Sequence, residues 1–202
     1  MVLKHAMLRP MVERLSDKRI GGVSPGIYYL RKPDRMQYYG YRDMTSITLK
    51  HTTEPFDFSR KEEFLQPKET EVLHGGAMMV RRDVINRVGK MTEVYFLFYE
   101  EFDWSRRIRE AGYILYYEPM SGVYHKESMS IPPATPFREY YMARSRVIYA
   151  RRNNKGWRKL LSCCYLLFLV MLKKAMVFVK KGRLDLLKAT FLGTCSGIRK
   201  KI

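Results

Sequence analysis

Apolar and polar residues alternate along the first two thirds of the chain in runs that predict both strands and helices. Residues 5–15 predict a short helix, and RIGGVSPGIYYL, residues 19–30, predicts a strand, a Gly/Pro turn and an extended aromatic segment. HGGAMMVRRDVINRVG, residues 74–89, predicts a short buried strand and a helix that ends at Gly89. Residues 40–72 are polar and contain prolines, so we expect a long surface loop there.

A second set of elements surrounds a group of acidic residues. The aromatic run YFLFY, residues 95–99, precedes a predicted helix over residues 100–111, which Gly112 ends. YILYY, residues 113–117, predicts a strand, Pro119 a turn, and the following GVYH another short extended piece. Strands and helices that alternate in this way favour an α/β layer architecture.

Composition and charge divide the chain into two parts. The 202 residues are 46% apolar and 13% aromatic, which is typical of a folded domain and excludes a disordered chain. Residues 1–137 contain 21 Lys/Arg and 18 Asp/Glu, whereas residues 138–202 contain 17 and 2. We therefore predict a near-neutral domain over residues 1–136 and a basic helical tail over residues 137–202. The three cysteines show no metal or disulfide spacing, which favours a reducing compartment.

The tail combines its cations with an apolar run. Residues 160–172 are thirteen uncharged positions, fewer than the roughly 20 that a membrane-spanning helix needs. The lysines at 173, 174, 180 and 181 recur after seven residues and share one helical face. A helix lying in the interface of an anionic membrane accounts for both features, and a buried hairpin with a solvated basic face is the alternative. Nucleic-acid binding is disfavoured, because a nucleic-acid groove does not need the apolar run.

Three carboxylates, those of Glu100, Glu101 and Asp103, stand at a predicted helix start, directly after the aromatic run. One interpretation is structural, because the helix macrodipole favours negative charge there and nearby arginines balance it. The other is catalytic: one carboxylate acts as a general base on a sugar hydroxyl, with a pKa raised by apolar walls and like charges. Aromatic faces beside such a base suit stacking on a sugar ring.

Residues 74–130 resemble the second half of family 2 glycosyltransferases of the GT-A fold, in particular rhamnosyltransferase-like bacterial members. The resemblance rests on the order of motifs: a small-residue strand and helix, an aromatic run, an acidic pair, an Arg, Gly and aromatic pattern, and a His. KRIGGVSPGIYYLRKPDRMQYYG, residues 18–40, also resembles the family's middle strand and loop. The likeness covers roughly residues 1–153. It implies an α/β fold, the C-terminal portion of a Rossmann-like GT-A domain followed by amphipathic membrane-associated helices.

The resemblance also implies roles for particular residues. Glu101 matches the second member of the family's acidic pair, more often Asp, and would be the base that activates the acceptor hydroxyl, with Glu100 and Asp103 beside it. His125 matches a position that approaches the metal or the diphosphate in some GT-A enzymes, although a lone His is more often structural. Substrate-binding roles are implied for four further residues: Gly75, Gly76, Trp104 and Arg107.

In the family a donor-binding half precedes the matched region and carries an Asp motif for Mg²⁺ or Mn²⁺. No such segment is recognised in this sequence, so we expect a chain without its N-terminal half. A truncated gene, a wrongly assigned start, or a split enzyme whose other half is a separate partner would each account for this. The main ligands of the divalent cation would lie in that half. Because the leaving diphosphate normally needs such a cation, we expect no transferase activity from the 202-residue chain alone.

The leading hypothesis is an enzyme of cell-surface polysaccharide synthesis. It would transfer a sugar from a nucleotide-sugar donor to a glycan or lipid-linked acceptor, by an inverting single displacement. The apolar basic tail places it in the cytoplasm, at the inner face of the cell membrane. The alternative is a non-catalytic, membrane-associated remnant or assembly subunit that keeps only the acceptor-side scaffold.

Overall fold

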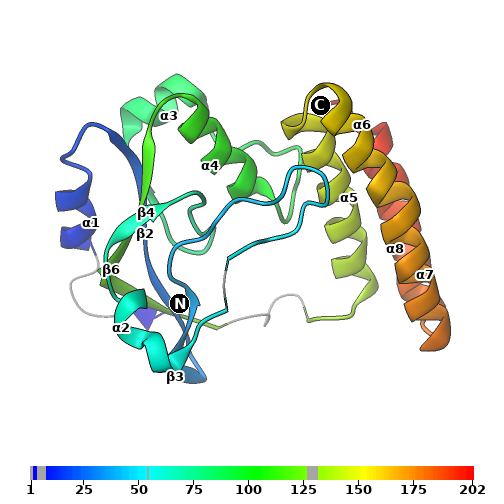
Figure 1. Cartoon of the computed structure of the whole chain (residues 1–202), viewed down its shortest axis with the longest axis horizontal. Coiled ribbons are helices and arrows are strands. Elements are labelled where there is room, and N and C mark those ends of the chain that lie inside the picture. Colours follow the sequence, from blue (N-terminus) through cyan, green and yellow to red (C-terminus); the bar gives the residue numbers. More distant parts are fainter. Residues whose placement is uncertain (1, 4–7, 54, 127–131) are drawn as a thin grey trace. The chain divides into compact units, whose positions relative to one another are not determined.

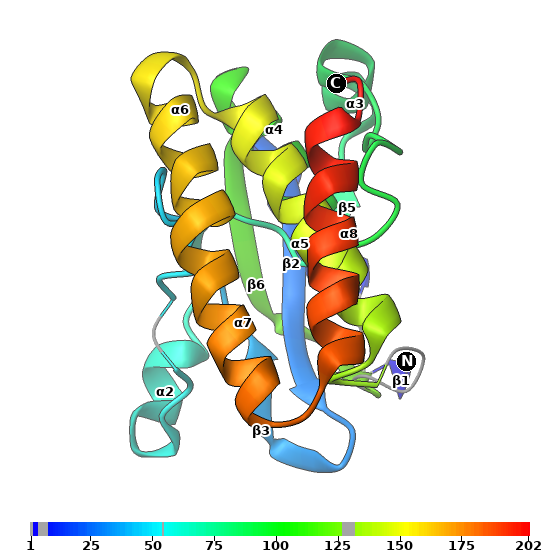
Figure 2. The ribbon, with the colours of Figure 1, turned by 90° about the vertical axis from the view of Figure 1, so that its right-hand side faces the viewer.

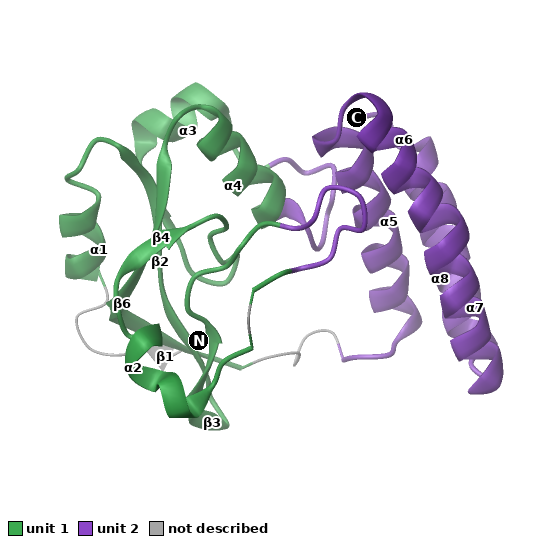
Figure 3. Cartoon of the chain, in the orientation of Figure 1, with its two compact units in different colours: residues 1–43, 52–91, 101–127 green, residues 44–51, 92–100, 128–202 purple. Residues whose placement is uncertain are grey.

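The computed structural model describes residues 2–3, 8–53, 55–126 and 132–202, and the chain forms two compact units (Figure 1, Figure 3). Unit 1 comprises residues 1–43, 52–91 and 101–127, and unit 2 comprises residues 44–51, 92–100 and 128–202. The second unit therefore includes residues 44–51, 92–100 and 128–136 of the region that the sequence suggests is a single domain over residues 1–136. Strands and helices are mixed as expected, so the prediction of an α/β fold is confirmed.

The described strands of unit 1 form one sheet. They are β1 (Val2–Leu3), β2 (Ile20–Tyr29), β3 (Lys32–Tyr38), β4 (Lys68–Thr70), β5 (Met79–Val80) and β6 (Ile114–His125). Their order is β1-β6-β2-β3, with β4 also paired to β6 and β5 also paired to β2. The long strands β2 and β6 run parallel along the centre of this sheet, and the other pairings are antiparallel (Figure 1).

Both central strands continue through prolines at which the sequence predicts turns, so the two predicted turns are wrong. Pro25 lies opposite Glu118 and the next residue, Gly26, lies opposite Gly122, so β6 bulges between these partners. The buried carboxylate of Glu118 accepts a hydrogen bond of 2.8 Å from Arg14 of α1 (Leu8–Arg14). A bulge of this kind lets a proline stay in a strand, since the residues around it leave the regular ladder.

Three of the described helices of unit 1 lie where the sequence predicts helices. Besides α1, the helices of the unit are a 3₁₀ turn (Phe58–Arg60), α2 (Lys61–Phe64), α3 (Arg82–Val88) and α4 (Glu100–Glu110), whose first residue belongs to unit 2. Gly89 ends α3 at φ +81°, and Gly112 follows α4 at φ +91°, which confirms both predicted stops. The predicted loop over residues 40–72 is wrong in part, because it contains β4, α2 and the 3₁₀ turn.

Side chains of α3, α4 and the sheet share one apolar core. Val84 of α3, Ile108 of α4 and Leu115 of β6 are fully buried there, and Trp104 and Leu73 complete the cluster. Burying each such side chain contributes roughly 1.5–3 kcal/mol. The start of α4 is therefore carried by a packed layer rather than by a mobile loop.

Unit 2 is helical (Figure 2). Its helices are α5 (Pro136–Asn153), α6 (Gly156–Cys164), a π-helical stretch (Tyr165–Val170), α7 (Met171–Lys180) and α8 (Leu184–Arg199). α5 packs closely on α8, since a Cβ added at Gly197 would lie 2.6 Å from the carbonyl oxygen of Arg144. Among the described residues one helix, Gly156–Lys180, is long and apolar enough to cross a membrane by length and composition alone. Most of its apolar surface is exposed.

Candidate active site

The loop after β4 is fixed to two neighbouring elements of unit 1. The backbone N–H of Leu73 donates to Oγ of Ser105 on α4, and that of His74 donates to Oγ of Ser24 on β2, both at 3.0 Å. The N–H of Gly76 donates to Nδ1 of His74 at 3.0 Å. Both serines are buried, so these bonds are shielded from water. The loop therefore holds its glycines in one place beside α4.

Glu101 lies against this loop. A Cβ added at Gly75 would lie 3.7–3.9 Å from Cβ, Cγ and Cδ of Glu101, so the side chain of Glu101 passes beside the bare glycine backbone. Gly75 is exposed and Glu101 is partly buried, which leaves this corner open to a ligand. The structure thus brings together the expected base and one of the two expected glycines, and Gly76 follows in the same loop.

His74, which the sequence does not single out, is held as a neutral imidazole next to this corner. Its ring lies among those of Tyr38, Tyr41 and His125, at centroid distances of 5.5, 6.0 and 6.2 Å. Burial, and to a smaller extent His125, lowers the pKa of His74 from its ordinary value of 6.5 to about 4. Because Nδ1 accepts a hydrogen bond from Gly76, the proton of the neutral ring resides on Nε2.

We expect His74 to make the folded chain less stable as the pH falls. Its folded pKa of about 4 lies below 6.5, so between these values the unfolded chain binds a proton that the folded chain does not. The stabilisation is fully present above pH 6.5 and is lost toward pH 4, at most about 3 kcal/mol. Urea unfolding at pH 7 and pH 4.5 measures this loss.

His74→Asn is the matched variant for that measurement, because the Asn oxygen can still accept the bond from Gly76. The variant is expected to lose less stability than the wild-type chain over the same pH interval. Other titrating groups act in both chains, so the difference between the two isolates His74. Equal losses in the two chains would contradict the assignment.

Glu100 is a member of the acidic group whose carboxylate pKa is raised in the folded chain. Burial raises the pKa of Glu100, and its Oε2 is buried with no hydrogen-bond partner among the described residues. The sequence predicts such a raised pKa, caused by apolar surroundings, for one carboxylate of the acidic group. A buried carboxylate oxygen without a partner is costly and is found where a site has a use for it.

Trp104 and Arg107 contact the end of α3, and Asp103 pairs with Arg107. Asp103 is fully buried and accepts a bond of 3.0 Å from Nε of Arg107. Arg107 also donates to two backbone carbonyls at the end of α3, at 2.6 and 2.9 Å. The indole Nε1 of Trp104 donates to the carbonyl of Gly89 at 2.8 Å. These contacts favour a structural role at the α3–α4 junction, and a direct role in catalysis or substrate binding stays a prediction.

His125 lies next to His74, and Nδ1 of His125 hydrogen-bonds Oε1 of Gln37 at 2.8 Å. A divalent cation needs several oxygen or nitrogen ligands around one point. Over residues 2–3, 8–53, 55–126 and 132–202, no three His, Cys, Asp or Glu side chains are grouped to hold a metal ion. The described residues therefore offer no complete ligand set of their own, and the metal role of His125 stays a prediction.

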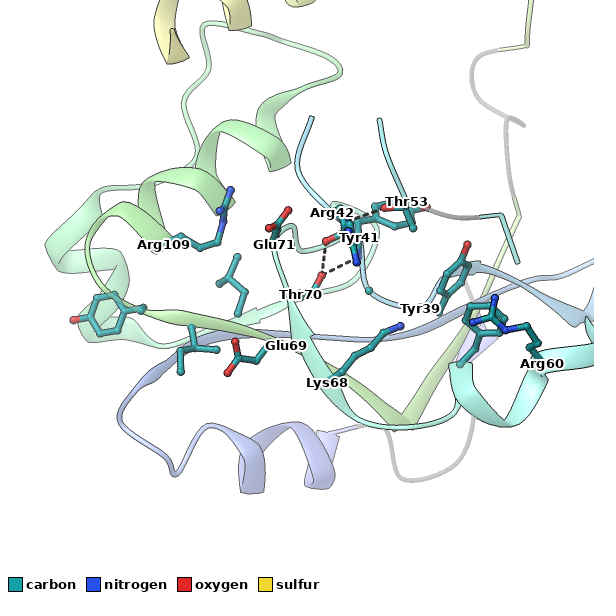
Figure 4. A pocket seen from close by; sticks show the side chains of 15 residues that line it. Tyr39, Tyr41, Arg42, Thr53, Arg60, Lys68, Glu69, Thr70, Glu71 and Arg109 are labelled. Carbon is teal, nitrogen blue, oxygen red and sulfur yellow. Dashed lines mark hydrogen bonds between the residues drawn. The ribbon is translucent and has the colours of Figure 1, made fainter. Parts of the chain in front are cut away.

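A polar cavity of about 760 Å³ opens in unit 1 between the α2–β4 segment and α4 (Figure 4). Its lining combines aromatic, charged and small residues, among them Tyr39, Tyr41, Arg42, Arg60, Phe64, Lys68, Glu69, Glu71, Arg109 and Tyr113. Thr70 shapes its floor, because its hydroxyl accepts from the Tyr41 N–H at 2.8 Å and donates to the Tyr41 carbonyl at 2.9 Å. Aromatic faces with charged groups in one hollow suit a sugar ring.

Tyr41 lines this cavity and also interacts electrostatically with Glu101, the expected base. Burial above all raises the pKa of Tyr41, and neighbouring tyrosines and Glu101 add to the shift. Its phenol therefore stays protonated and donates to the carbonyl of Gln37 at 2.5 Å. The sequence offered no signal for Tyr41, which lies in the predicted loop. Arg109, which pairs with Asp43, could have been found because it stands two helical turns after Glu101.

Comparison with known proteins finds similarity to glycosyltransferases. No family model matches the chain. An N-acetylglucosaminyl-diphospho-decaprenol L-rhamnosyltransferase of Mycobacterium tuberculosis is 28% identical over 152 residues, 69% of this chain and 48% of the relative. A dTDP-rhamnosyl transferase, RfbF, of Shigella flexneri is 26% identical over 141 residues, 66% of this chain and 47% of the relative. The chain spans about half the length of these curated relatives.

Among solved structures, GalNAc-T7 with UDP, GalNAc and Mn²⁺ aligns with a TM-score of 0.45 and 17% identity, over 75% of this chain and 32% of that chain. The two relatives are both bacterial rhamnosyltransferases, the group suggested by the order of motifs in the sequence. The resemblance of this chain to rhamnosyltransferase-like family 2 glycosyltransferases is thereby confirmed.

Proposed function

We propose that this chain forms the acceptor-side part of an inverting rhamnosyltransferase in cell-surface polysaccharide synthesis. The names of the relatives support this: one acts on N-acetylglucosaminyl-diphospho-decaprenol and the other is a dTDP-rhamnosyl transferase. Applied to this chain, they suggest dTDP-rhamnose as donor and a sugar carried on a lipid diphosphate as acceptor.

The position of Glu101 beside Gly75 is the observation that carries the proposal. In the proposed step, the Glu101 carboxylate accepts the proton of an acceptor hydroxyl while the hydroxyl oxygen bonds to the anomeric carbon of the donor. The bond from that carbon to the nucleotide diphosphate breaks, and the diphosphate leaves with the electron pair. Attack on the face opposite the leaving group inverts the anomeric configuration, and the proton ends on Glu101.

The remaining residues have supporting parts in this proposal. Gly75 and Gly76 leave room for the acceptor sugar next to the carboxylate, because they carry no side chain. Glu100 is the buried partner of the acidic pair. Asp103 and Arg107 keep the start of α4 in place. A divalent cation that stabilises the leaving diphosphate would take its main ligands from the donor-binding half, since the described residues offer no group of three His, Cys, Asp or Glu side chains for it.

Two measurements test the proposal. The first is binding of a short-chain N-acetylglucosaminyl-diphospho-prenyl analogue to the purified chain, followed by saturation-transfer NMR. The second is transfer of rhamnose from dTDP-rhamnose to this analogue, followed by mass spectrometry. Transfer is measured with the chain alone and with the joined enzyme, in which the chain is fused to the part of the M. tuberculosis relative that the match does not cover.

We expect the analogue to bind the chain and the joined enzyme to form an inverted rhamnoside. The inactivity of the 202-residue chain alone stays a prediction, which the same assay decides. Binding without transfer in the joined enzyme would favour the alternative, a membrane-associated assembly subunit. Failure of both binding and transfer would contradict the proposal.

Membrane association is a further part of the proposal, and vesicle flotation tests it. The exposed apolar face of Gly156–Lys180 lies next to Lys180 and Lys181, which are exposed as well. Since each cation near an anionic surface contributes about 1 kcal/mol, Glu at both positions should weaken binding at least tenfold. The chain is expected to float with vesicles containing phosphatidylserine and to float less as salt increases.

The matched control for flotation is Lys18→Glu, an exposed lysine of unit 1 whose replacement should leave binding unchanged. Retardation of DNA at the same salt concentration is measured in parallel. A chain that retards DNA and does not float would contradict the membrane assignment.

A further inference from the structure

The segment that leads into the acidic pair has an unusual backbone. Phe96, Phe98 and Tyr99 adopt positive φ angles of +67°, +65° and +73°. Bulky side chains rarely occupy this region, and they persist there only where the surroundings hold them. The segment continues without interruption into Glu100 and Glu101 at the start of α4. Strained backbone directly before a proposed catalytic carboxylate points to a functional constraint.

Two buried side chains of α5 hold this segment, and all of these residues belong to unit 2 (Figure 3). Nη1 of Arg144 donates to the carbonyl of Tyr95 at 2.7 Å. The hydroxyl of Ser145 lies 2.7 Å from the carbonyl oxygen of Leu97 and 3.3 Å from that of Tyr95. Bonds from a guanidinium are stronger than neutral ones, and their burial protects them from competing water.

Aromatic contacts extend the same attachment along the segment. Ring contacts join Tyr99 to Tyr149 at 5.7 Å and Phe96 to Tyr141 at 4.9 Å, and the Arg138 guanidinium lies 5.1 Å from the Phe98 ring. The α5 partners recur every three or four residues, the spacing that places them on one face of a helix. One face of α5 therefore contacts each of the three positive-φ residues and, through Arg144 and Ser145, the carbonyls of Tyr95 and Leu97.

We infer that Arg144 and Ser145 are positioning residues for the transfer reaction, an inference that rests on the proposed function. They fix the carbonyls of Tyr95 and Leu97 and so maintain the strained backbone of residues 96–99, which runs along the chain directly into Glu100 and Glu101. They would thereby restrict the backbone from which the Glu101 carboxylate acts, without contact between Arg144 and substrate. A displacement of about 1 Å in such a group can lower a rate about a hundredfold.

Arg144→Met tests this inference in the joined enzyme, because Met keeps the apolar stem and removes the donors. We expect kcat to fall about 10- to 100-fold, while the dissociation constant of the acceptor analogue changes less than about threefold. Hydrogen exchange of residues 92–100 should accelerate. Arg144→Lys, which keeps a donor, should recover most of the activity. Arg199→Met, an exposed position of α8, is the matched control and should leave all readouts unchanged.

Each outcome decides the inference. Wild-type kcat in Arg144→Met, or an affinity loss as large as the loss in kcat, would overturn it. If Arg144→Met does not fold, Ser145→Ala replaces it, because it removes the neighbouring hydrogen-bond donor. A fall in kcat with a nearly unchanged dissociation constant would support the inference, and an unchanged kcat would overturn it. The proposed function is tested separately by Glu101→Gln: if that variant loses turnover and the Arg144 and Ser145 variants do not, only the positioning inference fails.

Discussion

Glutamine in place of Glu101 is expected to lower kcat of the joined enzyme by about 10²- to 10⁴-fold. Gln has almost the same shape and fits the same space beside Gly75, but it cannot accept the proton of the acceptor hydroxyl. The dissociation constant of the acceptor analogue should change less than about threefold. Rhamnoside formation followed by mass spectrometry gives the rate, and saturation-transfer NMR gives the affinity.

Glu110→Gln is the matched control, because it neutralises an exposed carboxylate at the other end of the same helix. It should leave kcat within about twofold of wild type. Glu101→Asp, which places the family's more frequent residue at this position, should retain part of the activity with a shorter reach. Full turnover by Glu101→Gln would move the role of base to Glu100 or Asp103.

The choice of Glu101 over its neighbours follows from their surroundings. Asp103 is fully buried and paired with Arg107, so a substrate hydroxyl cannot reach it without breaking that pair. Glu100 has the raised pKa expected of a base, but its Oε2 is buried away from solvent, which favours the part of a partner. Glu101 alone lies against an exposed glycine of the loop that follows β4.

Local sequence rules predicted the elements around this site well. The helix over residues 100–111 and its stop at Gly112 correspond to α4, since both rest on helical periodicity and on a glycine with positive φ. The helix α3 and its stop at Gly89 are predicted from the same two features. The predicted turns at Pro25 and Pro119 are wrong, because the paired bulge that accommodates them depends on the register of two distant strands.

Other features of the site lay beyond any local rule. Phe96, Phe98 and Tyr99 carry no signal for positive φ, because glycine would be the expected residue there, and only contacts from α5 explain them. The neutral state of His74 depends on burial among tyrosines that come from other parts of the chain. The sequence therefore predicts the presence of the acidic pair but not the strained backbone that precedes it.

Alanine at Asp103 is expected to destabilise the chain by about 3 kcal/mol or more. Its carboxylate is almost inaccessible, with 1% of the side chain exposed, and it is paired with Arg107 at 3.0 Å. Removing one partner of a buried pair costs about 3–5 kcal/mol, since the other charge is left without compensation. Here Arg107 keeps its bonds to the carbonyls at the end of α3, which holds the expected cost near the lower limit. Urea unfolding at pH 7 measures the change.

Arg106→Ala provides the contrast within the same helix. Arg106 pairs with Glu110 at the same spacing of four residues and the same distance of 3.0 Å, but 65% of the Glu110 side chain is exposed. An exposed pair contributes at most about 1 kcal/mol, so this variant should remain close to wild type. If Asp103→Ala were as stable as Arg106→Ala and yet lost turnover, Asp103 would belong to the catalytic group. A large loss of stability in Asp103→Ala alone would instead support the structural role at the α3–α4 junction, because burial is the main difference between the two pairs.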